Sequence, residues 1–168
     1  MKKFLLLGLF LSFTGCATTT GLAPKVTSSG FDGSKRVSIE GHGVACDQML
    51  CPLIGANWSS NTPNLVGLKI SVMNGLVSIN SVDLNIDGEI IKLRENTLTD
   101  FSTDTVLESS KTFVTDLTIV DKIINAKRAW IRVNTNKGLI ENPIIDGSKD
   151  SKAYHALKRF KDQINTSK

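Results

Sequence analysis

Short runs of alternating apolar and polar residues dominate the chain once the first thirty residues are passed. A first predicted strand lies around Val37, and longer alternating runs follow at residues 65–73 and 77–86. A period of two over such lengths, interrupted by turn residues, is typical of antiparallel β-strands with one buried face. Asn74-Gly75 lies between the two long runs and predicts a hairpin that pairs them.

The clearest hairpin signal is Asp87-Gly88. Leu84 and Ile86 precede it and Ile91 follows, so apolar residues alternate on both sides of the turn. Asp-Gly readily adopts the positive φ angles that a type I′ turn requires. We therefore expect two strands joined at this point.

The second half of the chain mixes strands with helices. Residues 96–110 are polar and predict a long loop, and residues 111–116 predict another strand. Apolar residues at helical spacing then predict a short helix over 118–126. Alternation over 129–133, followed by an Asn-Lys-Gly turn and an apolar return over 139–145, predicts a further pair of strands.

The C-terminal segment has the pattern of an amphipathic helix. Ser151 is a suitable N-cap residue. Five apolar residues fall on one stripe: Ala153, Ala156, Leu157, Phe160 and Ile164. The predicted fold is mainly β, an antiparallel β-sandwich or open barrel of six to eight strands, with one short helix and this C-terminal amphipathic helix laid on it.

The first fifteen residues have the organisation of a secretory signal. Lys2 and Lys3 form a positive start, residues 4–13 are apolar, and Gly15 stands directly before Cys16. The apolar stretch is too short to cross a bilayer, which takes ~20 residues.

Ser12-Phe13-Thr14-Gly15-Cys16 resembles the lipobox of bacterial lipoproteins, although Phe13 stands where that family prefers leucine. The resemblance implies cleavage before Cys16 and acylation of its thiol and amino group, an anchor that more than one acyl chain makes stable. Ala17 and Thr18 follow in place of the aspartate that retains such proteins in the inner membrane. The resemblance therefore implies a lipid-anchored protein at the periplasmic face of the outer membrane; an ordinary signal peptide is the alternative.

Composition then divides the rest of the chain. Residues 16–30 are rich in Thr, Ser, Gly and Ala and predict a flexible tether, which leaves 31–168 as a single β-rich domain after the signal peptide 1–15. The chain has 20 Lys and Arg against 16 Asp and Glu, and two of the lysines belong to the leader. The mature part is thus close to neutral, and nothing in its charge predicts a nucleic-acid partner.

Cys46 and Cys51 remain once Cys16 is acylated. An oxidising compartment favours a disulfide between them. A zinc site would need about four ligands, and only His42 and His155 could join the two thiols. A third possibility is that His42 activates Cys46 as a nucleophile, which requires a free thiolate.

Three residues stand out as a possible binding surface. Trp130 and Arg132 share the strand face opposite Ala129 and Ile131, and this pair of residue types is enriched at binding surfaces. The favoured alternative is that Trp130 is an apolar floor for the closing helix while Arg132 reaches solvent. His42 lies between two glycines, which could admit a ligand or simply make a turn before the disulfide.

The mature segment also resembles an uncharacterised family of small Gram-negative envelope lipoproteins, through the cysteine pair, the Asn85-Ile86-Asp87-Gly88 hairpin and the Ser151-Lys152-Ala153 helix start. That resemblance implies no activity, catalytic residue or cofactor.

Common hydrolase and nucleotide motifs do not occur in the sequence. We therefore expect a non-catalytic binding or envelope-structural lipoprotein, with an envelope protein or a glycan as partner. The alternatives are a cell-envelope hydrolase or transferase whose site lacks a known motif, and an inhibitor of a hydrolase.

Overall fold

The structure is a computed structural model that describes residues 23–94, 98–103 and 106–167. The predicted signal peptide and Cys16 lie outside these residues. The first sheet has the order β1-β2-β3-β4-β8-β7, with strands Lys25–Ser28, Lys35–Gly43, Pro52–Ser59, Leu65–Met73, Glu108–Asp116 and Asp100–Ser102. The second sheet has the order β11-β10-β9-β5-β6, with strands Lys149–Asp150, Gly138–Asp146, Arg128–Thr135, Ile79–Ile86 and Glu89–Leu93. The helices are α1 (Thr118–Asn125) and α2 (Lys152–Ser167).

Both sheets are antiparallel and share one apolar core. Their inward-facing side chains are almost fully buried, among them Ile54, Leu68, Phe113, Leu84 and Ile131. Eight of the strands have five or more residues, and β1, β7 and β11 are shorter. The predicted class, a mainly β antiparallel fold with one short helix and a C-terminal helix, is confirmed.

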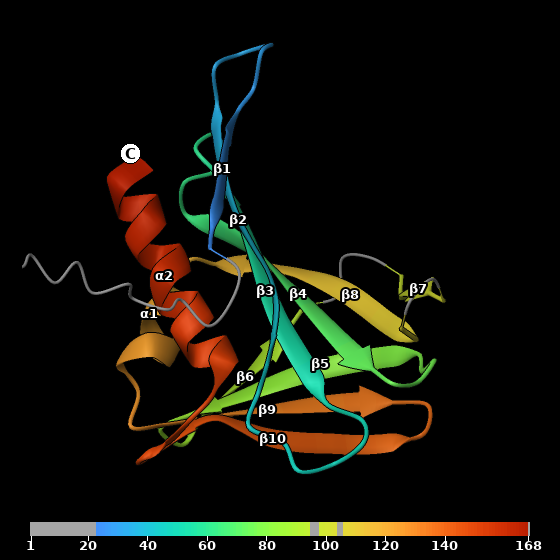
Figure 1. Cartoon of the computed structure of the whole chain (residues 1–168). Coiled ribbons are helices and arrows are strands. Elements are labelled where there is room, and N and C mark those ends of the chain that lie inside the picture. Colours follow the sequence, from blue (N-terminus) through green and yellow to red (C-terminus); the bar gives the residue numbers. More distant parts are fainter. Residues whose placement is uncertain (1–22, 95–97, 104–105, 168) are drawn as a thin grey trace, which may run out of the picture.

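The closing helix α2 forms as its apolar stripe predicts. All five stripe residues are buried, Phe160 completely. Ser151 Oγ accepts a hydrogen bond of 3.2 Å from the backbone N–H of Tyr154, which caps the helix N-terminus. The helix packs on β2 and β3 of the first sheet and also touches β10 and α1. It lies along one side of the two sheets (Figure 1).

The hairpin at Asp87-Gly88 is confirmed. Ile86 pairs with Glu89, and Leu84 with Ile91. Asp87 and Gly88 have φ angles of 49° and 95°, as a type I′ turn requires.

The hairpin predicted at Asn74-Gly75 is wrong. β4 pairs with β3 and β8, and β5 lies in the other sheet. Asn74 does adopt a positive φ of 64°, but neighbouring segments take up the hydrogen bonds of the turn. Its backbone N–H donates to Leu107 O at 2.9 Å, and the Ser109 hydroxyl donates to Gly75 O at 3.2 Å. The turn therefore carries the chain from one sheet to the other.

Three further segments differ from the prediction. β1 lies inside the predicted tether and pairs with β2, so the folded part begins before Phe31. All four residues of β1 are exposed, and the strand therefore has no alternation of apolar and polar residues by which it could be predicted. β3 was not predicted, because Pro52 and Gly55 interrupt its apolar pattern. Part of the predicted loop 96–110 forms β7 and the start of β8.

Candidate functional site

The second sheet has one face that no helix covers within the described part of the chain. In β9, Ala129, Ile131 and Val133 are completely buried, whereas the alternating residues Arg132 and Asn134 are exposed. We call the surface on this side of the sheet the outer face. Its residues are Asp83, Asn85, Ile90, Lys92, Arg128, Trp130, Arg132, Asn134, Leu139 and Glu141.

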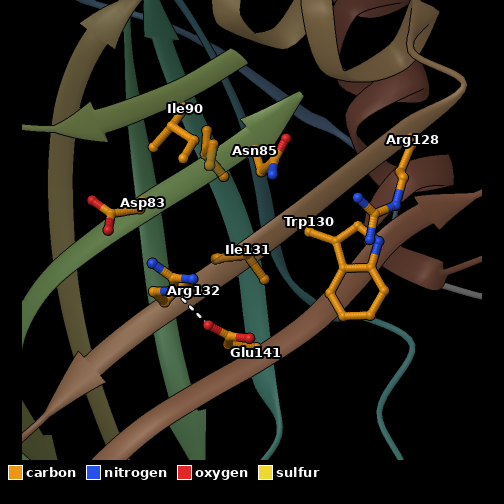
Figure 2. A pocket seen from close by; sticks show the side chains of 9 residues that line it. Asp83, Asn85, Ile90, Arg128, Trp130, Ile131, Arg132 and Glu141 are labelled. Carbon is orange, nitrogen blue, oxygen red and sulfur yellow. Dashed lines mark hydrogen bonds and ion pairs between the residues drawn. The ribbon is translucent and has the colours of Figure 1, made fainter. Parts of the chain in front are cut away.

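Trp130 is held in place on the outer face by two charged neighbours. Its indole Nε1 donates a hydrogen bond of 2.8 Å to Asp146 Oδ2. Arg128 Nε lies 3.3 Å from the same oxygen, and the Arg128 guanidinium carbon lies 5.0 Å from the indole centre. This second distance is within cation–π range, and Figure 2 shows the two side chains against each other. Trp130 therefore loses little freedom when a partner binds.

Four charged residues form a line across the outer face, which we call the charged row. Asp83 of β5 pairs with Lys92 of β6 and with Arg132 of β9. Arg132 in turn pairs with Glu141 of β10, and their side chains form an ion pair, drawn as a dashed line in Figure 2. The charge therefore alternates in sign from β6 to β10.

A second line, the tryptophan row, runs beside the charged row. Asn85 pairs with Ile90 on one side and with Trp130 on the other, and Trp130 pairs with Pro143. Ile90 is 61% exposed, as is Leu139 farther along the face. The outer face thus presents apolar surface next to alternating charge.

Two shallow hollows meet at Trp130 and Glu141. One, of about 160 Å³, lies over β5, β6 and β9 and is lined by Asp83, Asn85 and Ile90 among others. The other, of about 350 Å³, extends over β10 to Ala45 and Asp47. Together they make a continuous, slightly concave surface with an aromatic ring at its centre.

The structure corrects the favoured interpretation of Trp130. The closing helix packs on β2 and β3, while Trp130 faces the opposite side of its sheet from the core. Trp130 therefore does not form the apolar surface on which that helix packs. It lies beside Arg132, as the shared strand face predicted, and both line the first hollow.

His42 does not join this surface. It lies within β2 and is buried, so the turn predicted between its flanking glycines is wrong. The pairing of β2 with β3 shifts register between Ile39 and His42, a β-bulge opposite Gly55. A Cβ on Gly55 would lie 2.9 Å from Ile39 O, so Gly55 permits the close approach of the two strands at the bulge.

Cys46 and Cys51 form the predicted disulfide, with their Cα atoms 5.9 Å apart. The bond leaves no free thiolate for the nucleophile hypothesis. No group of three or more potential metal ligands occurs among the described residues, so the zinc hypothesis gains no support there. The disulfide loop instead reaches the second sheet, where Ala45 N–H donates to Pro143 O at 3.0 Å.

Two carboxyl groups with a lowered pKa lie away from the outer face. Hydrogen bonds from Ser34, and then from Asn61 and Ser29, hold the pKa of Asp32 well below its usual range. A hydrogen bond with Ser71, and then the charge of Lys69, lower the pKa of Glu108 against the opposing effect of its burial. Asp32 lies in the turn between β1 and β2, and Glu108 begins β8, so both lie on the side of the first sheet.

Sequence reasoning found Trp130 and Arg132 but missed their neighbours. Glu141 could have been found by counting outward from the turn between β9 and β10, whereas a shift in register between Pro143 and Ile145 hides the position of Asp146. Asp83, Asn85 and Ile90 lie far earlier in the chain, and no local signal indicates that β5 lies beside β9.

Neither helix of the described residues is long and apolar enough to cross a membrane. The chain matches no protein-family model, no curated protein and no solved structure.

Proposed function

We propose that this protein is a lipid-anchored lipoprotein of the bacterial envelope that acts by binding a partner through the outer face of its second sheet. The anchor is inferred from the leader, where a positive start, an apolar stretch and Gly15-Cys16 follow in the order that export and acylation require. The folded domain would then stay at the membrane surface and meet partners at the periplasmic side of the outer membrane.

One observation carries the binding proposal: Trp130 lies partly exposed and already oriented in the middle of an uncovered sheet face. A hydrogen bond to Asp146 and the stacked Arg128 guanidinium fix its ring. Trp and Arg are the residue types that contribute most to binding energy at interfaces. A surface organised in this way suits recognition, whereas a hydrolase or transferase needs perturbed titratable groups gathered in its pocket.

Photo-crosslinking in intact cells tests this proposal. A photoreactive phenylalanine analogue replaces Ile90 or Leu139, both exposed on the outer face, and in a control replaces Leu65, which is 39% exposed on the first sheet. We expect adducts of one defined mass from positions 90 and 139 and none from position 65. Equal labelling at all three positions, or no adduct from the outer face, would overturn the proposal.

A further inference from the structure

The charged row is complementary to itself. Read from β6 to β10, its charges are positive at Lys92, negative at Asp83, positive at Arg132 and negative at Glu141. Read in the reverse direction, every position carries the opposite sign. A surface with this property fits a second copy of itself when that copy is turned so that the order of its strands is reversed.

A single two-fold rotation produces this arrangement. Its axis lies between the two copies and runs along the strands, between β5 and β9. The β6 strand of one copy then faces β10 of the other, and β5 faces β9. Lys92 meets Glu141 of the second copy, and Asp83 meets Arg132 of the second copy. The strands of the two copies remain nearly aligned, which is a common way for sheets to pack face to face.

The same rotation places the exposed side chain of Ile90 against the second copy. Along the tryptophan row, Ile90 of β6 comes to face Pro143 of β10 in the second copy, and Asn85 comes to face Trp130 of the second copy. Ile90 is 61% exposed in the single chain and has no apolar cover of its own. One rotation therefore pairs the opposite charges and covers Ile90, and each of these contacts occurs twice in the symmetric pair.

The charge pattern also excludes the other simple orientation. Rotation about an axis along the charged row itself would place Arg132 against Arg132 of the second copy and Asp83 against Asp83. Like charges facing each other across an interface are strongly unfavourable. The charged row is therefore compatible with the first orientation and disfavours the second.

We propose that the partner of the outer face is a second copy of this chain, paired through the charged row and the tryptophan row. This inference rests on the proposed function, since it names the partner of the same surface. Four strands spaced ~4.8 Å apart give a small interface, below the ~800 Å² per partner of typical stable complexes. Confinement of lipid-anchored chains to one membrane surface raises their effective concentration and compensates for a small contact.

A charge-exchange experiment in cells tests the pairing. The full chain carries the photoreactive residue at position 90, and the readout is an adduct of twice the mass of the chain. Asp83→Arg alone places Arg against Arg132 of the second copy, and Arg132→Asp alone places Asp against Asp83. We expect each variant alone to reduce the dimeric adduct at least tenfold. Co-expression of the two should restore it, since each new charge then meets its opposite in the other copy.

Restoration of the dimeric adduct by co-expression distinguishes a lost interface from a folding defect, because a second variant would not rescue a misfolded chain. Lys35→Asp, an exposed charge change on the first sheet, should leave the adduct unchanged. A dimeric adduct that is equally strong in both single variants would overturn the pairing. An adduct with a different protein, or a glycan retained by a monomeric chain, would overturn the pairing and leave the binding face in place. Absence of adducts from position 90 alone would overturn the pairing, and their absence from both position 90 and position 139 would overturn the proposed function itself.

Discussion

Gly88 is the residue whose backbone conformation most clearly depends on its type. It has a φ of 95° at the tip of the turn between β5 and β6, and a Cβ built there would meet nothing within 4 Å. The requirement is therefore one of backbone conformation and not of space. This turn sets the register that places Asn85 opposite Ile90 and Asp83 opposite Lys92 on the outer face.

We expect Gly88→Ala to lower the free energy of unfolding by about 1–2 kcal/mol, because an L side chain at this φ is strained. Gly43→Ala is the matched control, since Gly43 also has open space around its Cβ position but an ordinary φ. Its effect should be close to zero or slightly stabilising. Urea unfolding of both variants measures the difference, and equal midpoints would contradict the argument.

The sequence predicts contacts between individual residues where a turn between adjacent strands fixes the register. The predicted turn at Asn136-Lys137-Gly138 sets Thr135 opposite Gly138, and counting outward from it gives Arg132 opposite Glu141. The pairing of Arg132 with Asp83 depends on which strands become neighbours. That choice is made by the shared core, where Ile131 and Leu84 pack together, and no property of either residue alone reveals it.

Among the elements, α2 is tied to α1 by a partly buried ion pair. Lys161 Nζ lies 2.6 Å from Asp121 Oδ2, and the lysine side chain is only 15% exposed. The Tyr154 hydroxyl also donates to Ile124 O at 3.2 Å. The polar side of α2 is thus not uniformly solvated, although its basic residues have the spacing of a solvated face.

Lys161→Glu should lower the free energy of unfolding by about 1–2 kcal/mol, because it places a second carboxylate against Asp121 in a partly buried site. Lys158→Glu is the control on the same helix. Lys158 is exposed and only contacts the Tyr154 ring, at 5.4 Å, so its reversal should change stability by no more than ~0.5 kcal/mol. Thermal unfolding at low ionic strength distinguishes the two, and equal melting temperatures would refute the role of the ion pair.

The local pattern of apolar and polar residues predicts most of the helices and strands. It fails where a strand could pair with more than one neighbouring strand. α2 has an apolar periodicity and the Ser151 cap, and the Asp87-Gly88 hairpin has alternation and a suitable turn. α1 forms from its apolar periodicity without a side-chain cap. Asn74-Gly75 carries the same turn chemistry, yet its flanking strands bury their apolar faces from opposite sides of the core. The preference of both strands for different neighbours therefore outweighed the local hairpin signal.

In the whole molecule, the disulfide loop links the two sheets. It joins β2 to β3 in the first sheet and reaches the edge of β10 in the second through Ala45 N–H and Pro143 O, 3.0 Å apart. Lys149 adds an ion pair of 3.8 Å with Asp47. The loop thereby borders the hollow that continues the outer face past Trp130.

The double variant Cys46→Ser, Cys51→Ser should lower the free energy of unfolding by about 2 kcal/mol. The cysteines are five positions apart, and closing so short a ring restricts the unfolded chain only moderately. Reductant should destabilise the native chain by a similar amount and leave the double variant unchanged. Sensitivity of the double variant to reductant would show that the effect lies elsewhere.

The proposed lipid anchor at Cys16 would determine both the location of the molecule and the strength of the proposed pairing. Cys16→Ala removes the only thiol that the lipobox resemblance assigns to acylation, so the chain should appear uncleaved or in the soluble fraction instead of processed and membrane-bound. Thr18→Ala, which leaves Cys16 intact, should remain in the membrane fraction.

Release from the membrane should also weaken the dimeric adduct from position 90, because chains that diffuse in three dimensions lose the effective concentration that a shared surface provides. Fractionation and crosslinking of the same cells measure both effects together. Processed, membrane-bound protein without Cys16 would overturn the anchor. A soluble Cys16→Ala chain with an undiminished adduct would show that the outer face holds the pair together without help from the membrane, and that its contact energy exceeds what so small an interface is expected to supply.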